Sequence, residues 1–358
     1  MNPRIAILIP AYNEEVVIKD TIDALLTAGV ESSDIYVVDD RSTDKTAEIV
    51  RSCNVNVFTV PENGGKARAQ TQALAHFKLL DRYEWICFLD GDTKVDVNFY
   101  HEMCKAATDD PSVALYVGQV KSVKNDHIFS ASRAFDYTYG QDVAKHGQSN
   151  FNVIFVSPGC SSMYRADVLS TLSIDHLTLA EDMDLTMQVH RSGGVVKYLP
   201  RAIVNTQDPA TFSDYHKQVM RWYRGYWQVV LKHKVFGWQK KQRIDLYMML
   251  LTADALIYNR VLWLALILVT NATILPFIFA ADLALAGCIA AYAAHRTSRW
   301  DVLYKFPVYY WLSYLNFYAF ARGFIEIVLF RKEILAWNKV ARYEFNNHLS
   351  HPKGDLAT

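Results

Sequence analysis

The chain has 358 residues, enough for two domains, and its 37 Lys and Arg residues balance its 37 Asp and Glu residues. A nucleic-acid-binding protein usually carries a basic excess, so the zero net charge argues against that class. The five cysteines are odd in number and show no Cys-x-x-Cys spacing, which argues against a disulfide framework and a zinc site and indicates reduced cytosolic thiols. The N-terminal apolar run is too short for a signal peptide or a membrane span.

Short apolar runs alternate with stretches of helical spacing over residues 5–89. The predicted strands are Ile5–Pro10, Ile35–Val38, Val55–Val60 and Trp85–Leu89. The predicted helices are Val16–Ala28, a segment capped near Ser42 and ending at Arg51, and Ala67–Leu80. This alternation with short connections predicts an α/β fold with a mostly parallel sheet and helices on both faces.

Carboxylates follow the ends of these predicted strands. Glu14 follows the first strand, Asp39 and Asp40 close the second, and Asp90 and Asp92 follow the fourth. Ligands of open α/β sheets bind beyond the carboxyl ends of the strands. Two carboxylates on either side of a glycine suit a hard divalent cation shared with phosphate oxygens, although an ordinary Asx turn has the same composition.

Lys66 follows a glycine pair and begins a predicted helix, a combination that favours phosphate binding. The alternative is a plain turn with a solvated lysine. The chain has neither the GxGxxG nor the GxxxxGK[ST] motif, so neither a Rossmann dehydrogenase nor a P-loop NTPase is supported.

The ordered motifs PAYNEE, VVDDRSTD, NGGKA and FLDGD resemble those of the family-2 glycosyltransferases, which have the GT-A fold and use nucleotide-diphosphate sugars. The resemblance implies a nucleotide-sugar site, with uridine bound at Ala11, Tyr12, Glu14 and Asp39 or Asp40. It places Lys66 near the nucleotide. Asp90 would lie at the ribose or phosphate and would be shared between the nucleotide and the metal. Asp92 would ligate Mg²⁺ or Mn²⁺.

The middle of the chain continues with less regular elements. We expect helices at Asn98–Thr108 and Ile128–Lys145, strands at Ser112–Ser122 and Val153–Val156, and edge strands at Val195–Leu199 and Ala202–Asn205. The small-residue stretch Ser157–Arg165 leaves backbone open to a sugar, or else forms a simple strand–turn–strand. By resemblance to the family, Gly159, Cys160 and Ser161 border the acceptor site.

Glu181, Asp182 and Asp184 precede or begin a predicted helix, where acidic residues commonly complement the helix dipole. Sugar transfer with inversion also needs a base that takes a proton from the acceptor hydroxyl. TLAEDMDLT resembles the ED motif of membrane-bound family-2 synthases, which implies that Asp182 is the catalytic base and that Glu181 supports it. We expect Asp184 to be a helix-capping or surface residue.

Gln218, Arg221 and Trp222 fit the pattern QxxRW and share one face of a predicted helix over Phe212–Leu231. Arg221 can clamp a diphosphate, and Trp222 can offer a ring face to a sugar. The motif resembles that of processive synthases and certain glycolipid transferases, which assigns Gln218 and Trp222 to the acceptor. The aromatic and basic residues of this helix also suit a membrane surface, and a helix without a catalytic role is the alternative.

The last third is mostly apolar and predicts about three membrane spans, near residues 246–270, 273–294 and 307–330. Arg322 and Glu326 could pair at helical spacing in the last one. Basic segments at 295–305 and 331–342 would both lie in the cytosol by the positive-inside rule, which three simple spans do not allow. Trp337, Lys339 and Arg342 resemble the W-x-K-x-x-R ending of such synthases.

These patterns divide the chain into four parts. We expect a cytosolic GT-A domain over residues 1–210, interfacial amphipathic helices over 211–245, a transmembrane region over 246–330 and a basic tail over 331–358.

The expected function is inverting, metal-dependent transfer from a UDP-sugar, best UDP-GlcNAc, to a growing β-linked polysaccharide at the plasma or inner membrane. The motifs resemble synthases of poly-N-acetylglucosamine, chitin, hyaluronan and cellulose. Expected partners are the UDP-sugar, a polysaccharide or lipid acceptor, the bilayer and an accessory membrane subunit, without nucleic acid. One alternative is a glycolipid synthase similar to ceramide glucosyltransferases, which adds one sugar to a lipid. Another is a catalytically silent membrane scaffold.

Overall fold

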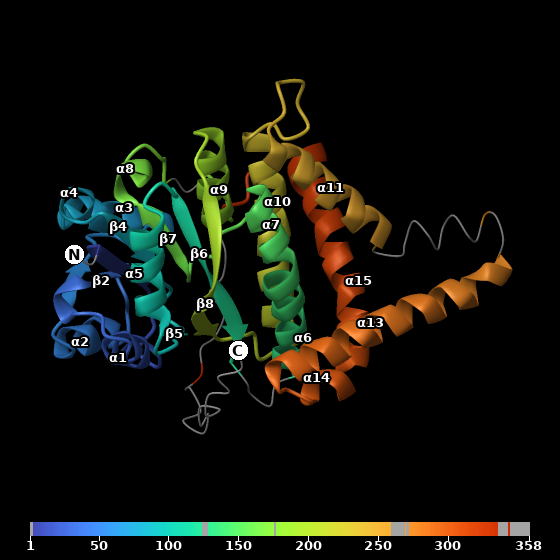
Figure 1. Cartoon of the computed structure of the whole chain (residues 1–358), viewed down its shortest axis with the longest axis horizontal. Coiled ribbons are helices and arrows are strands. Elements are labelled where there is room, and N and C mark those ends of the chain that lie inside the picture. Colours follow the sequence, from blue (N-terminus) through green and yellow to red (C-terminus); the bar gives the residue numbers. More distant parts are fainter. Residues whose placement is uncertain are drawn as a thin grey trace.

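The computed structural model describes residues 3–123, 128–174, 177–258, 269, 272–335 and 343. A sheet covered by helices forms the N-terminal part, and long helices pack beside it (Figure 1). Trp337, Lys339 and Arg342 of the predicted tail motif lie outside the described residues.

An eight-stranded sheet in the order β3-β2-β1-β4-β7-β6-β8-β5 forms the centre of the N-terminal part. Its strands are β1 (Ile5–Ala11), β2 (Ile35–Asp39), β3 (Asn56–Thr59), β4 (Trp85–Phe88), β5 (Thr93–Val95), β6 (Leu115–Ser122), β7 (Ser162–Arg165) and β8 (Val196–Thr206). β3, β2, β1 and β4 are parallel, whereas β7 is antiparallel to both β4 and β6. The predicted mostly parallel α/β architecture is confirmed.

Two predicted strand assignments are wrong. Val153–Val156 is an extended loop without strand pairing, held by hydrogen bonds such as the one from Lys145 Nζ to the Val156 carbonyl (2.8 Å). The two expected edge strands are one continuous strand, β8, which lies between β6 and β5. The register slips there from Leu199 opposite Gly118 to Ile203 opposite Gln119, so Pro200, which has no N–H to donate, lies in the irregular step.

Side chains of β1 alternate between two hydrophobic cores, one on each face of the sheet. Ile5, Ile7 and Ile9 pack with α1 (Ile18–Thr27), α2 (Thr46–Ser52) and α5 (Phe99–Asp109). Ala6 and Leu8 pack with α3 (Lys66–His76), α4 (Leu79–Arg82), α8 (Ala166–Leu169) and α9 (Glu181–Arg191). This double covering matches the near-continuous apolar sequence of β1, which both faces bury.

Helices form most of the remaining part of the chain that the structure describes. They are α6 (Ile128–Tyr137), the π-helix η2 (Thr138–Lys145), α7 (His146–Phe151), α10 (Phe212–Lys232), α11 (Arg243–Tyr258), α13 (Leu275–Thr297), α14 (Asp301–Tyr304), α15 (Phe306–Gly323) and the π-helix η4 (Phe324–Leu329). Short 3₁₀ turns are η1 (Ser32–Asp34) and η3 (Ala272–Ile274). α10 packs along α15, and α13 extends outward from this group (Figure 1).

One helix among the described residues, Pro276–Thr297, is long and apolar enough to cross a membrane, with a mean hydropathy of 1.9. It corresponds to the second predicted span, and most of its surface is not covered by protein. Residues 259–268 of the first predicted span lie outside the described part of the chain. In the third predicted span, Arg322 Nε pairs with Glu326 Oε1 at 3.0 Å, as expected. Arg224 Nε of α10 also pairs with Glu326, through Oε2, at 2.7 Å.

Aromatic residues of α10 pack against other helices of the protein. Trp227 Nε1 donates to the Phe320 carbonyl of α15 at 3.0 Å, and the Tyr226 and Thr252 hydroxyls lie 2.6 Å apart. Gly323 of α15 permits this approach, because a Cβ there would lie 3.2 Å from the Tyr223 backbone. These contacts give the aromatic residues a packing role, and the interfacial placement of residues 211–245 remains a prediction.

Helix α9 is fastened to α10 and α11 by buried charges. Asp184, expected at a cap or on the surface, is instead only 2% exposed and accepts from Lys232 Nζ at 2.8 Å and His233 Nε2 at 2.7 Å. Arg191 at the other end of α9 pairs with the fully buried Asp245 at 2.5 Å. Helical spacing brings Asp184 to the face of α9 that meets α10, so the surface assignment is wrong.

Gly225 brings α10 against the residue that precedes α9. A Cβ at Gly225 would lie 2.6 Å from Ala180 Cβ and 2.9 Å from Ala180 N, closer than real carbon contacts allow. Gln228 on the next turn accepts a hydrogen bond from Leu179 N at 2.8 Å. The start of α9 therefore depends on a bare backbone at Gly225.

We predict that Gly225→Ala destabilises the protein by about 1–3 kcal/mol, the usual range for overpacking a tight core. Gly147→Ala is the matched control, since it lies in α7 and a Cβ there meets nothing within 4 Å. Thermal unfolding of both variants in the same detergent measures the effect. Equal midpoints for the two variants would show that the Ala180 contact is not tight.

Candidate active site

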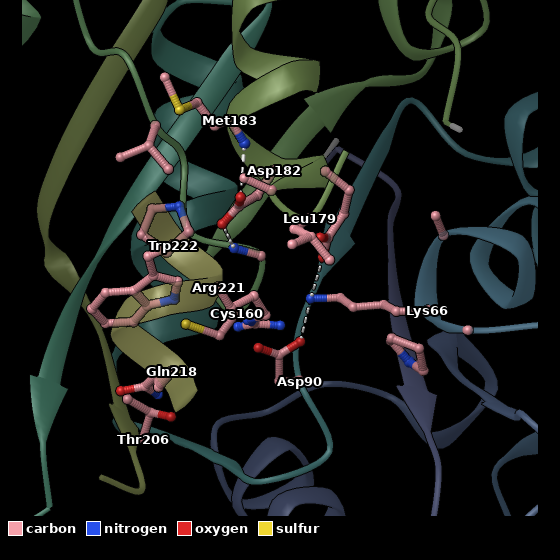
Figure 2. A pocket seen from close by; sticks show the side chains of 18 of the residues that line it. Lys66, Asp90, Cys160, Leu179, Asp182, Met183, Thr206, Gln218, Arg221 and Trp222 are labelled. Carbon is pink, nitrogen blue, oxygen red and sulfur yellow. Dashed lines mark hydrogen bonds and ion pairs between the residues drawn. The ribbon is translucent and has the colours of Figure 1, made fainter. Parts of the chain in front are cut away.

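A cavity of about 800 Å³ lies where the carboxyl ends of β1, β2 and β4 face α10 (Figure 2). Every residue predicted for the nucleotide, metal, catalytic and acceptor sites lines it except Asp39 and Ser161. Those lining it are Ala11, Tyr12, Glu14, Asp40, Lys66, Asp90, Asp92, Gly159, Cys160, Glu181, Asp182, Gln218, Arg221 and Trp222. Segments distant in the sequence thus meet around one space.

The ends of β1 and β2 form the predicted nucleotide side of the cavity. Ala11 pairs with Asp39 in register, and the buried Asp39 carboxylate accepts from Ser42 N at 3.0 Å. Asp40 accepts from Gly64 N at 3.0 Å and Gly65 N at 2.8 Å, so its carboxylate shapes the NGGK turn. Burial raises the pKa of Asp40, and these two N–H groups oppose the shift.

Lys66 lies between two carboxylates in the middle of the cavity. Its Nζ is 2.6 Å from Asp90 Oδ1 and 3.2 Å from Glu181 Oε1, and Figure 2 shows it pointing across the cavity. Burial alone would lower the pKa of Lys66, but Asp90 and Glu181 raise it above its ordinary value. Lys66 is therefore a fixed cation that joins the end of β4 to the start of α9.

Asp90 and Asp92 offer the oxygen ligands that a divalent cation needs. Asp92 is 3% exposed and Asp90 half-buried, and both line the cavity. Among the described residues, no group of three or more His, Cys, Asp and Glu side chains could hold a metal. Mg²⁺ commonly takes one or two protein carboxylates together with substrate phosphates and water, so this pair fits a cation shared with a diphosphate.

Asp182 lies at the first turn of α9, facing the cavity. Its Oδ1 accepts from Met183 N at 2.8 Å, and its Oδ2 accepts from Gly159 N at 3.3 Å. Burial and the neighbouring Glu181 raise the pKa of Asp182 to about 6, while Lys66 and Arg221 oppose the rise. A carboxylate with that pKa is ionised at neutral pH and is a stronger base than an ordinary aspartate.

The three residues of QxxRW face the cavity from α10 (Figure 2). Arg133 of α6, which is 2% exposed, organises two of them. Its Nη2 donates to Gln218 Oε1 at 2.8 Å, and its guanidinium lies 4.4 Å from the centre of the Trp222 ring. Arg133 therefore holds the Gln218 amide and the indole plane together by a hydrogen bond and a cation–π contact.

Gly159 and its neighbours connect the two sides of the cavity. A Cβ at Gly159 would lie 2.5 Å from Lys66 Nζ, so the bare backbone leaves room for the lysine. Cys160 lines the cavity, while the buried Ser161 donates from its hydroxyl to the Gly118 carbonyl at 3.3 Å. Ser161 therefore has a structural contact, and its role toward the acceptor remains a prediction.

Several cavity residues were missed by the motif analysis. Tyr137, Gln141 and Lys145 line the cavity from α6 and η2, and Arg133 supports it from behind. These four residues recur every four positions, which is the signal that could have found them. The sequence alone does not tell which neighbour such a helical row of polar and aromatic residues faces. Only the folded chain shows that the row faces Asp182 and α10.

Residues 3–225 match the family described as "Glycosyltransferase like family 2". Similar proteins include a probable glycosyltransferase, YdaM, of Bacillus subtilis, 29% identical over 64% of this chain and 57% of the relative. A poly-beta-1,6-N-acetyl-D-glucosamine synthase of Staphylococcus aureus is 26% identical over 69% of this chain and 60% of the relative. The chain thus spans less than two thirds of the length of these relatives.

A solved structure shares the fold. It is the mannosyltransferase PcManGT from Pyrobaculum calidifontis in complex with GDP-Man and Mn²⁺, which is 22% identical and has a TM-score of 0.58. The match covers 93% of this chain and 89% of that one. The predicted GT-A fold and the predicted transferase class are therefore confirmed, and the family model spans the motifs from PAYNEE to QxxRW. The chain belongs to glycosyltransferase family 2.

Proposed function

We propose that this glycosyltransferase uses a UDP-sugar, best UDP-GlcNAc, and a divalent cation to extend a β-linked N-acetylglucosamine polymer at the membrane. The observation that carries the proposal is that one cavity brings Asp90 and Asp92, Asp182, and Arg221 together. The similarity to a poly-beta-1,6-N-acetyl-D-glucosamine synthase supports the choice of donor and product.

On the donor side, Asp90 and Asp92 would hold Mg²⁺ or Mn²⁺, which would offset the negative charge of the diphosphate. Lys66 and Arg221 line the same space and add fixed positive charge near the leaving group. Tyr12, Glu14 and Asp40 would bind the nucleoside, with Asp39 holding the loop behind them. Six carboxylates line the cavity together with the permanent cations Lys66 and Arg221, an acidic balance that suits a bound divalent cation.

On the acceptor side, Asp182 takes the proton of the attacking hydroxyl. The hydroxyl oxygen bonds to the anomeric carbon from the face opposite the diphosphate, and the bond from that carbon to the diphosphate oxygen breaks. The configuration inverts in one step, with no covalent enzyme intermediate. The contribution of the chain is positioning and charge stabilisation.

Trp222 and Gln218 would bind the acceptor ring, with the indole face against sugar C–H groups. Gly159 and Cys160 would border the same ring, since both line the cavity beside Asp182. Arg133 fixes the indole and the amide before any ligand binds, which lowers the ordering cost of binding.

We predict UDP release with UDP-GlcNAc that requires Mn²⁺ or Mg²⁺ and stops when a chelator is added. Asp92→Asn should reduce this turnover by at least a hundredfold, because removing an electrostatic stabiliser of a leaving group costs about that much. The assay measures UDP release across UDP- and GDP-sugars with and without Mn²⁺. Full turnover in chelator would remove the metal from the mechanism.

We predict that kcat/KM falls as pH decreases through about 6, because Asp182 must be ionised to accept a proton. Asp182→Asn should lower kcat by about 10²–10⁴-fold, the usual contribution of a general base. Asp109→Asn, an exposed residue on α5, is the control and should keep wild-type kcat. A metal-replete Asp182→Asn enzyme with normal turnover would exclude this residue as the base.

The membrane part of the proposal rests on α13, whose exposed apolar residues include Phe277, Phe279 and Leu285. We predict that the full chain stays in the membrane pellet after an alkaline carbonate wash, because about 20 apolar residues suffice to span a bilayer. The catalytic part would then face the cytosol. Complete release into the supernatant would rule out an integral span.

A further inference from the structure

We propose that Tyr137, Gln141 and Lys145 form a subsite for the acceptor sugar, binding its hydroxyl or acetamido groups beside Asp182. The inference rests on the proposed function and adds to it a second part of the acceptor site, on α6 and η2, in addition to the QxxRW residues of α10. We call these three residues the π-helix row.

The π-helix row is continuous with the QxxRW face through Arg133. Arg133 lies four positions before Tyr137 and holds Gln218 and Trp222, so the row begins where the acceptor ring would stack. Its far end, Lys145, donates to the Val156 carbonyl at 2.8 Å. Val156 leads directly into Gly159, whose N–H reaches the Asp182 carboxylate. Lys145 thus contacts the segment that leads to the Asp182 carboxylate, and all three residues line the same cavity as Trp222 and Asp182.

Gln141 and Lys145 lie in a π-helix, Thr138–Lys145, which follows Tyr137 at the end of α6, and a π-helix is a rare form that often marks functional sites. Its other face is turned away from the cavity, with Tyr139 52% and Val143 49% exposed. The three residues of the row all line the cavity, and two of them, Gln141 and Lys145, are at most 6% exposed. Polar side chains are thus buried on the ligand side of this helix.

Gln141 supplies the observation that points to a ligand. Its Oε1 is buried and meets no hydrogen-bond partner among the residues that the structure describes. Leaving a buried acceptor unpaired is unfavourable, so such groups usually meet a ligand or water in use. Because an amide oxygen accepts only, the complementary ligand atom is an O–H or N–H, as on a sugar hydroxyl or acetamido group.

Lys145 adds a second polar contact close to the base. Burial lowers the pKa of Lys145 to about 7, although Asp182 acts in the opposite direction. Near neutral pH its amino group can therefore donate or accept a hydrogen bond, which suits an uncharged hydroxyl better than a permanent cation would. Tyr137 completes the row with an aromatic ring, a surface that sugars commonly contact.

The test uses the full-length protein with Mn²⁺, UDP-GlcNAc and a tetrasaccharide of β-1,6-linked N-acetylglucosamine as the acceptor probe. Gln141→Leu and Lys145→Met keep side-chain size and remove the polar atoms. We expect each to raise the KM for the tetrasaccharide about three- to tenfold, the loss of one hydrogen bond, and to leave the KM for UDP-GlcNAc within twofold. Val143→Ala, on the outer face of the same helix, should change neither KM.

Gln141→Glu keeps an accepting oxygen and should return the tetrasaccharide KM toward the wild-type value, which a purely structural role would not do. Unchanged tetrasaccharide KM in both Gln141→Leu and Lys145→Met, with wild-type turnover intact, would overturn the subsite alone. An equal rise in both KM values, not corrected by Gln141→Glu, would also overturn it. A wild-type enzyme that transfers no sugar to the tetrasaccharide would contradict the proposed function instead.

Discussion

The contact between the start of α9 and the middle of α10 is the constraint on which the site depends. Asp182 projects from the first turn of α9, and Arg221 and Trp222 project from α10, so the spacing of the two helices decides how far Asp182 lies from the two α10 side chains. The bare backbone of Gly225 allows the approach at Ala180, and Asp184 with Lys232 and His233 closes the other end of the contact. Breaking a buried ion pair costs several kcal/mol, so the ion pairs of Asp184 keep α9 and α10 at a fixed separation.

Ion pairs between side chains that line the cavity also fix its geometry. Lys66 pairs with both Asp90 and Glu181, offsets one of their two negative charges, and thereby joins the sheet to α9 across the cavity. A cation bound by Asp90 and Asp92 would compete with Lys66 for Asp90. The same network acts on Asp182, because Glu181 raises the pKa of Asp182 and Lys66 lowers it.

Much of the fold, and which residues line the cavity at the strand ends, could be predicted because both follow from local sequence. A buried parallel strand brings the carboxylates that close or follow it to the carboxyl end of the sheet, as Glu14 after β1, Asp39 and Asp40 at β2, and Asp90 and Asp92 after β4 do. Motif order then identified the family before any contact was known. The predicted roles of Asp39, Asp40 and Ser161 remain open, since the structure gives each a backbone partner.

The rest could not be predicted because it depends on contacts between distant segments. In the sequence, Asp184 has the position of a capping residue. In the structure it is buried because α10 and the residue after it bring Lys232 and His233 to its carboxylate. The sequence pattern of β8 predicts two edge strands. The structure has one strand that pairs with β6 on one side and with β5 on the other. Arg133 lies 85 positions before Gln218, to which it donates a hydrogen bond. No local pattern indicates that the helix face with Arg133 and the π-helix row is the buried one.

Stereochemistry of the product tests the central claim most directly, because one-step attack assisted by Asp182 requires inversion at the anomeric carbon. Product made from α-linked UDP-GlcNAc labelled with ¹³C at C1 can be sized by chromatography and its anomeric carbon assigned by NMR. The account predicts β-linked chains of several added sugars. An α-linkage would contradict the mechanism, and a single sugar attached to a lipid would contradict the polymer as product.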